Sequence, residues 1–141
     1  DTIKNPIIIK NKLGIDKENI SEKILKRLIL EDIEGFMKEL GDGFSYIGSE
    51  YKIKINNTYN YIDLLLFNIK YNCYVVVELK VTEVKKEHIG QVEVYMNYID
   101  KHIKGINNNK TIGIIVARRD NHYYIEYSSD KRIYTRDYEI V

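Results

Sequence analysis

The sequence contains the stretch Tyr61-Ile-Asp-Leu-Leu-Leu-Phe67, followed after a short polar interruption by Cys73-Tyr-Val-Val-Val-Glu-Leu-Lys80. Both runs are rich in β-branched, aromatic and leucine residues, which predicts two strands joined as a hairpin. The second run is apolar almost throughout, as is typical of an inner strand in a sheet that is covered on both faces. The expected architecture is therefore an α/β domain with a central sheet flanked by helices.

Three charged residues interrupt these strands: Asp63, Glu78 and Lys80. A charge in a core strand is costly unless it is paired or bound to a metal. Because side chains alternate along a strand, Glu78 and Lys80 share one face, about 6 to 7 Å apart, while Leu79 lies on the other. The two strands therefore carry a charged cluster whose presence needs a reason.

The register of the hairpin decides whether the two carboxylates meet. With an even-length loop the paired residue numbers sum to 139 or 141, which sets Asp63 opposite Val76 or opposite Glu78. Either register brings the carboxylates onto one face within reach of a shared ion, whereas a sum of 140 would separate them. Alternation along the first strand also groups Asp63 with Tyr61 and Leu65.

Two carboxylates and a lysine at this spacing suit a hard divalent cation. Mg²⁺ prefers oxygen ligands, keeps several waters, and is often bound by one or two carboxylates together with a substrate phosphate. Such an ion would acidify a water and offset charge on a scissile phosphate, while Lys80 would orient the nucleophile or stabilise developing charge. The pattern indicates phosphodiester hydrolysis, and the alternative is a buried ion-pair cluster.

The remaining pattern predicts one domain over residues 16–141, preceded by an N-terminal arm over residues 1–15. Asn19 or Ser21 can cap a helix whose apolar stripe continues until Gly41-Asp42-Gly43 ends it, which predicts one long first helix. A second helix is expected over residues 87–104. Strands are expected over 44–47, 51–55, 59–67, 73–80, 111–117 and 122–127, with a tight turn at Asn56-Asn57.

Composition excludes several classes of protein. With 141 residues and 44% apolar content the chain can form a core without disulfides, and one cysteine fits a reducing, cytoplasmic setting. No apolar run approaches the roughly 18 residues that span a bilayer, so no membrane partner is expected. The net charge of +1 requires any nucleic-acid surface to be local. Because the chain starts at Asp1, we expect it to be the C-terminal part of a longer protein.

Asp63 followed by Glu78-Leu79-Lys80 resembles the PD-(D/E)xK nuclease motif, and Gln91-x-x-x-Tyr95 is similar to the motif of RecB-like nucleases. The resemblance is closer still to the YhcG-like group of this superfamily, and it covers nearly the whole chain from about residue 20. The stretches that carry it, in the order the group shows, are Glu39–Gly48, Tyr61–Phe67, Val76–Lys80, Gly90–Tyr95, Thr111–Val116 and Glu126-Tyr127.

The resemblance implies a restriction-endonuclease-like core, a central mixed sheet with elements in the order αβββαβ plus extra strands. It implies a DNA endonuclease that uses Mg²⁺, for which Mn²⁺ can substitute, and an N-terminal helical DNA-binding domain that this chain lacks. It assigns metal binding to Asp63, Glu78 and Glu39. It assigns catalysis to Asp63, Glu78 and Lys80, with Gln91 and Tyr95 positioning the nucleophile or a phosphate. A homodimer would cut both strands in one encounter.

Basic residues near the expected site provide candidate contacts to a nucleic-acid backbone. Lys85 and Lys86 precede the second helix, and Arg118 and Arg119 follow a strand close to further tyrosines. The alternative for these residues is a solvated charged loop. The three histidines lack the spacing of a zinc site.

Two stretches depart from the family pattern. Val81-Thr82-Glu83-Val84 stands where the family has a small residue and a glycine-containing turn, and Gly48-Ser49-Glu50-Tyr51 lacks the basic and amide residues expected before the tyrosine. These departures favour an alternative function, a catalytically degenerate nuclease fold that acts as a nucleic-acid-binding or subunit-interaction module.

The substitution Asp63→Asn separates a functional site from a purely structural one. If Asp63, Glu78 and Lys80 only neutralise one another, the variant leaves a buried lysine unpaired and unfolds. If they form a nuclease site, the variant keeps or gains stability, because functional carboxylate clusters are often strained. We expect an unchanged or raised melting temperature for the metal-free variant, and an unfolded variant would support the structural hypothesis.

Overall fold

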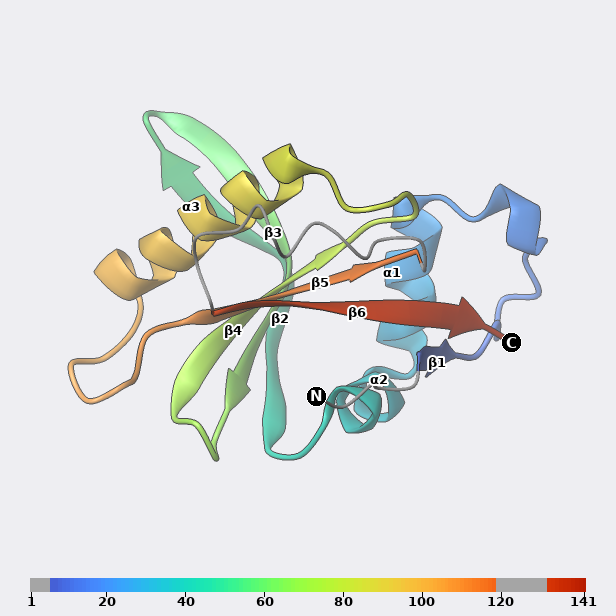
Figure 1. Cartoon of the computed structure of the whole chain (residues 1–141), viewed down its shortest axis with the longest axis horizontal. Coiled ribbons are helices and arrows are strands. Elements are labelled where there is room, and N and C mark those ends of the chain that lie inside the picture. The colour runs from blue at the N-terminus through green and yellow to red at the C-terminus, as the bar shows by residue number, and fades with distance from the viewer. Residues whose placement is uncertain (1–5, 119–131) are drawn as a thin grey trace.

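One mixed sheet of six strands organises residues 6–118 and 132–141, the part of the chain that the computed structural model describes (Figure 1). The strands are β1 (Ile7–Ile9), β2 (Phe44–Ile55), β3 (Thr58–Asn68), β4 (Cys73–Leu79), β5 (Ile112–Ala117) and β6 (Ile133–Ile140). Their order is β1-β6-β5-β4-β3-β2. The pairs among β2, β3 and β4 are antiparallel, and all other pairs are parallel, which confirms the mixed sheet.

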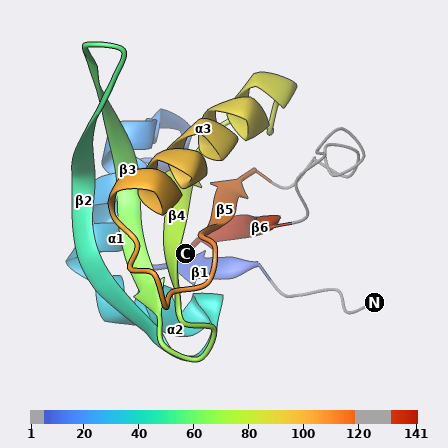
Figure 2. The same ribbon diagram turned by 90° about the vertical axis from the view of Figure 1, so that its left-hand side faces the viewer.

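Helices cover both faces of this sheet. Figure 2 shows α1 (Glu22–Glu31) and α2 (Ile33–Leu40) on one side and α3 (Lys86–His102) on the other. The sequence of α1 and α2, three antiparallel strands, α3 and β5 confirms the expected αβββαβ order, with β1 and β6 as the extra strands. In the described residues, no helix combines the length and apolar character that a membrane crossing needs.

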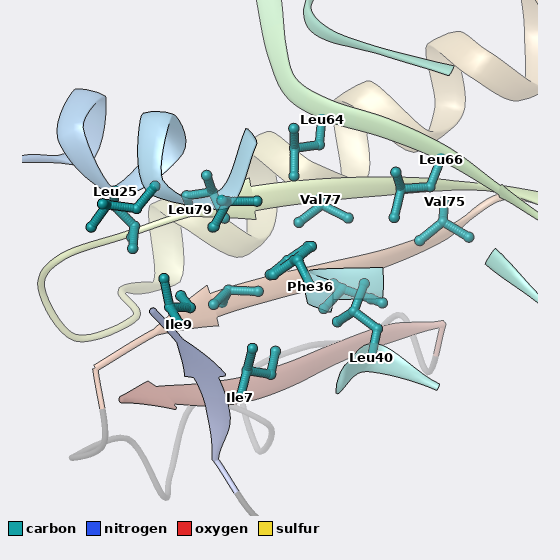
Figure 3. Close-up of a cluster of buried hydrophobic side chains, with 14 of the residues drawn as sticks. Ile7, Ile9, Leu25, Phe36, Leu40, Leu64, Leu66, Val75, Val77 and Leu79 are labelled. Carbon is teal, nitrogen blue, oxygen red and sulfur yellow. The ribbon is translucent and has the colours of Figure 1, made fainter. Parts of the chain in front are cut away.

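Two separate apolar clusters hold the layers together. Beneath α1 and α2, Leu25 and Phe36 pack with Leu64 and Val77 of the sheet (Figure 3). Beneath α3, a second cluster joins that helix to the opposite face of the same strands. Because β4 is buried on both faces, its nearly continuous apolar sequence follows directly from its position.

A glycine allows α3 to lie close to β5. A Cβ atom added at Gly113 would stand 2.6 Å from Val92 Cγ1 and 2.9 Å from Met96 Sδ, both on α3. Such distances are too short for a side chain, so the absent Cβ sets how near the helix approaches.

The prediction of one long first helix is wrong, because Asp32 divides it. Asp32 has a non-helical backbone, with φ −144° and ψ 62°, and its side chain accepts the N–H of Gly35 at 3.1 Å. The same aspartate therefore ends α1 and caps α2. Of the two predicted N-terminal caps, Ser21 is the residue that caps α1.

The two strands predicted over 44–47 and 51–55 form one long strand, β2. A register shift between Tyr46 and Gly48 and a positive φ of 47° at Glu50 distort the strand without ending it. Bulges of this kind accommodate residues that break a strand pattern. Asn56 and Asn57 both have positive φ, which confirms the tight turn that joins β2 to β3.

The strands β1 and β6 pair at one edge of the sheet. Residues 7–9, predicted as part of an arm, form β1 and pair in parallel with β6. Sequence analysis did not predict β6, because charged residues interrupt its alternation. The predicted strand over 122–127 lies outside the described residues.

Candidate functional site

The antiparallel ladder between β3 and β4 ends where the charged residues begin. Its last backbone pair is Leu64 with Val77, so the residue numbers sum to 141 and Asp63 stands opposite Glu78, as one of the two predicted registers requires. The N–H of Asp63 donates to Glu78 Oε2 at 2.9 Å, and the N–H of Leu79 donates to Asp63 Oδ2 at 2.9 Å. The two carboxylates therefore accept the hydrogen bonds that backbone carbonyls would accept in a regular ladder.

Side-chain alternation reverses at the same point. Leu64 packs beneath α1 and α2, whereas Ile62 and Leu65 both pack beneath α3. Asp63 contacts α1, so it lies on the same side as its neighbour Leu64. The prediction that Asp63 and Leu65 share a face is therefore wrong, because alternation assumes a regular strand and this strand is distorted at Asp63.

A lysine from α1 forms the shortest ion pair at this site. Lys26 Nζ lies 2.8 Å from Asp63 Oδ1 and 3.0 Å from Glu50 Oε1, and its side chain is only 13% exposed. Burial lowers the pKa of Lys26, but the hydrogen bonds and charges of Asp63 and Glu50 outweigh it, and the pKa lies above its ordinary value. The ammonium group is therefore charged at neutral pH.

Sequence reasoning missed both Lys26 and Glu50. The register of β2 with β3 places Glu50 opposite Asp63, because its neighbours Ser49 and Tyr51 pair with Leu64 and Ile62. That register follows from the Asn56-Asn57 turn, so the position of Glu50 opposite Asp63 could have been predicted from the sequence. Lys26 follows the buried Leu25 on α1, but no local pattern shows that it points toward the carboxylates.

Glu78 is the most buried acid of the group, with 4% of its surface exposed. Burial raises the pKa of Glu78 to about 8, and the negative charge of Asp63 adds to the rise. The positive charges of Lys80 and Lys26 act in the opposite direction. Without a metal ion at the carboxylates, Glu78 therefore holds a proton at neutral pH.

Lys80 follows β4 and reaches toward α1 and α3. Its N–H donates to Val116 O at 2.8 Å, and its ammonium lies 3.9 Å from Glu22 Oε1. Burial lowers the pKa of His88 on α3, and the charge of Lys80 lowers it further. No ion pair in residues 6–118 or 132–141 joins Lys80 to Asp63 or Glu78. The three residues thus do not simply neutralise one another, because Asp63 takes its cation from α1.

Gln91 and Tyr95 project from one side of α3. Gln91 Nε2 donates to Tyr95 Oη at 3.0 Å, and Tyr95 is 4% exposed whereas Gln91 is exposed. Burial raises the pKa of Tyr95, and the charges of Glu78 and Asp63 raise it further. Tyr95 therefore lies on the α3 side of the sheet, where its hydroxyl feels the charges of both carboxylates.

Glu39 is not brought to this group. It lies in the last turn of α2, and its Oε1 accepts the N–H of Ile8 of β1 at 2.8 Å. Arg136 of β6 donates to the backbone carbonyl of Glu39 at 3.2 Å. The acid that α1 places beside Lys80 is instead Glu22, whose Oε1 lies 3.9 Å from the Lys80 ammonium.

Three of the four predicted nucleic-acid contacts can be placed. Lys85 and Lys86 are exposed at the start of α3, and Arg118 is exposed just after β5. The N–H of Arg118 donates to Thr82 O at 3.4 Å, so the strand end lies beside the loop that leads to the two lysines. Arg119 lies outside the described residues.

The donor set fits a hard divalent cation. Asp63 Oδ1 already holds a cation, the ammonium of Lys26, and Glu78 adds a second carboxylate beside it. Within the described residues, no cluster of three or more histidine, cysteine or acidic side chains has the geometry to hold a metal ion. An ion bound here would complete its shell with water and substrate phosphate, as Mg²⁺ commonly does.

Comparison with known proteins gives consistent results. A family model described as the YhcG PDDEXK nuclease domain matches residues 1–140. The curated Escherichia coli (strain K12) protein named "Putative nuclease YhcG" is 30% identical over 101 residues, which are 72% of this chain and 27% of that protein. The chain therefore spans about a quarter of this relative's length.

Solved structures share the fold. One is described as a repair endonuclease from Pyrococcus abyssi, with a TM-score of 0.58 and 19% identity over 89% of this chain and 50% of that chain. Another is described as an EndoMS-dsDNA2 complex, with a TM-score of 0.59 and 20% identity over 89% of this chain and 49% of that chain. These matches confirm the restriction-endonuclease-like fold.

The raised pKa of Glu78 predicts a pH-dependent stability. The folded pKa of about 8 exceeds the ordinary 4.5, so the folded protein holds a proton that the unfolded chain releases. The stability that this proton gives the folded protein is fully present below the ordinary pKa, and it is lost as pH rises through the folded pKa. We expect the free energy of unfolding, measured with urea in EDTA, to fall from about pH 5 to about pH 9. The variant Glu78→Gln should show a flatter profile, and identical slopes would contradict the assignment.

The position of Lys26 predicts opposite effects on stability and metal affinity. In Lys26→Met the half-buried Asp63 carboxylate loses its cation, so we expect the metal-free protein to lose about 1 to 3 kcal/mol of unfolding free energy. Calorimetric affinity for Mn²⁺ should rise, because the ammonium no longer competes for Asp63 Oδ1. The matched control is Lys23→Met, which changes an exposed lysine of the same helix. Equal stability and affinity in both variants would show that Lys26 does not act on the site.

Proposed function

Because this chain belongs to the family of YhcG PDDEXK nuclease domains, we propose that it hydrolyses DNA phosphodiester bonds with a divalent cation held by Asp63 and Glu78. The observation that carries the proposal is a pair of hydrogen bonds at 2.9 Å, which tie the Glu78 carboxylate to the N–H of Asp63 and the Asp63 carboxylate to the N–H of Leu79. Lys80, which directly follows β4, completes the motif. We further propose Mg²⁺ as the natural cation, with Mn²⁺ able to substitute.

The protein's part in the reaction is to hold charges in place. The backbone N–H groups of Asp63 and Leu79 orient the two carboxylates before any substrate arrives. A bound Mg²⁺ would supply an acidified water and offset the charge of the scissile phosphate. Deprotonation of Glu78 accompanies cation binding, because an added positive charge favours the carboxylate form.

Lys80 acts on the nucleophile or on the developing phosphate charge. Its N–H donates to Val116 O on β5, and its side chain is only 15% exposed. Preorganised charge of this kind stabilises a transition state without a reorganisation cost. Glu22 Oε1 lies 3.9 Å from this ammonium. We propose that Glu22, rather than Glu39, is the additional carboxylate that a helix contributes to the metal site.

Gln91 and Tyr95 position the attacking water or a phosphate from α3. Their mutual hydrogen bond at 3.0 Å holds the exposed amide of Gln91 against the hydroxyl of the buried Tyr95. Lys85, Lys86 and Arg118 form a basic surface beside the loop at Thr82, where a DNA backbone would lie.

Three further proposals concern the whole protein. We propose a cytoplasmic setting, an additional N-terminal helical domain that binds DNA, and a homodimer that cuts both strands of a duplex. A size measurement of the longer protein on DNA tests the last of these.

Cleavage assays test the proposed function directly. We expect plasmid, linear or four-way-junction DNA to be cut with Mg²⁺ or Mn²⁺ and to remain intact in EDTA. Lys80→Ala and Asp63→Asn should each lower the rate by about 10²-fold or more, because one lost charge stabiliser typically costs that much. The control is Lys101→Ala, an exposed lysine at the end of α3, which should leave the rate unchanged.

The outcomes separate the two functional hypotheses. Cutting that persists in both folded variants would remove these residues from the catalytic site. Binding of DNA and Mn²⁺ without any cutting would instead favour the degenerate nuclease fold that acts as a binding module.

A further inference from the structure

The hairpin of β2 and β3 carries a row of lysine and tyrosine side chains that starts at the candidate site. The register pairs Lys52 with Tyr61 and Lys54 with Tyr59 across the two strands. Continued inward by two residues on each strand, the same register places Glu50 opposite Asp63. Because side chains two apart lie on one face of a strand, all three pairs share a face.

Lys26 of α1 contacts this face at Glu50 and Asp63, and farther along the hairpin the face is open to solvent. The opposite face buries Ile53 and Ile62 beneath α3. Lys52 and Lys54 are exposed, and Tyr59 and Tyr61 expose 53% and 48% of their surface. Figure 2 shows the tip of the hairpin projecting past the helical layers. Large aromatic side chains on such a projection are open to a partner.

The two lysines gather around one aromatic ring. Lys52 Nζ lies 4.0 Å from the centroid of the Tyr59 ring, and Lys54 Nζ lies 5.7 Å from it. Residues 51–62 contain these two lysines and no acidic residue, whereas the whole chain carries a net charge of only +1. The hairpin is therefore a local concentration of positive charge on a nearly neutral protein.

We propose that this face, defined by Lys52, Lys54, Tyr59 and Tyr61, binds a single strand of nucleic acid and leads it to the carboxylates at Asp63. Surfaces that bind single strands combine cations for the phosphates with aromatic rings on which unpaired bases stack. A duplex keeps its bases stacked inside and would use the lysines alone. The paired tyrosines therefore favour a single strand over a duplex.

The spacing connects the surface to the reaction. Each two-residue step along a strand is about 7 Å, so the two Lys–Tyr pairs lie about 7 and 14 Å from Glu50 and Asp63 along the hairpin. This inference rests on the proposed nuclease function in one respect, that Asp63 is where the bound strand is cut. The binding surface itself is defined by the hairpin alone.

Fluorescence anisotropy in EDTA tests the surface without cleavage. The probes are a labelled oligothymidine of about 20 nucleotides and a duplex of equal length. The first variant is Tyr59→Thr with Tyr61→Thr, because threonine keeps the strand preference without the ring. The second is Lys52→Gln with Lys54→Gln. The matched control is Lys70→Ala with Tyr71→Ala, an exposed lysine and tyrosine in the β3–β4 turn.

The two variants should differ in kind. We expect the tyrosine variant to bind the oligothymidine about tenfold more weakly or worse, with an unchanged salt dependence and an unchanged affinity for the duplex. In the lysine variant, the slope of log affinity against log salt should become about 1.4 less steep. Each lysine that neutralises a phosphate of a single strand contributes about 0.7 to that slope, and the variant loses two lysines. The control should bind like the unaltered chain.

Several results would overturn the proposal: wild-type affinity in both variants, equal loss on the duplex and the oligothymidine in the tyrosine variant, or no binding by the unaltered chain. Cleavage is scored separately, with Asp63→Asn as the inactive reference. Cutting by a chain whose hairpin variants bind normally refutes the surface but leaves the nuclease function intact. Hairpin-dependent binding without cutting in Mg²⁺ or Mn²⁺ refutes the nuclease function but supports the surface.

Discussion

The exchange of hydrogen bonds between Asp63 and β4 is the constraint on which the site depends. A regular ladder would have satisfied these N–H groups with backbone carbonyls and left both carboxylates without a fixed place. Here the ladder stops at Leu64, and the acids take over as acceptors. The same distortion turns Asp63 toward α1, where Lys26 meets it. Fold and site are thus joined at one pair of residues.

Much of this arrangement could be predicted from sequence because it depends on short-range pattern. The hairpin register follows from the loop length, so the pairing of Asp63 with Glu78 was one of two foreseeable registers. The side of the sheet that Asp63 faces was not foreseeable, because alternation breaks at that residue. Gln91 and Tyr95 lie one helical turn apart, and their contact at 3.0 Å needs only helical geometry.

The rest depends on tertiary contacts or on local distortions. Lys26 reaches Asp63 because of how α1 lies across the sheet, which no local pattern encodes. Glu39 lies on α2, which Asp32 separates from α1, and it bonds to β1; a hydrophobic stripe does not reveal such a break. The strand β6 was missed because its charged residues hide the alternation that a sheet strand otherwise shows.

The bond from Ile8 to Glu39 has a consequence for the behaviour of the protein in concentrated solution. A terminal strand of a sheet offers outward backbone donors on which another chain can build, the usual origin of edge-to-edge aggregation. The strand β1 is only three residues long, and its central donor is already occupied by a carboxylate of the same molecule. Glu39, to which the family resemblance assigned metal binding, therefore protects the edge of the sheet against self-association.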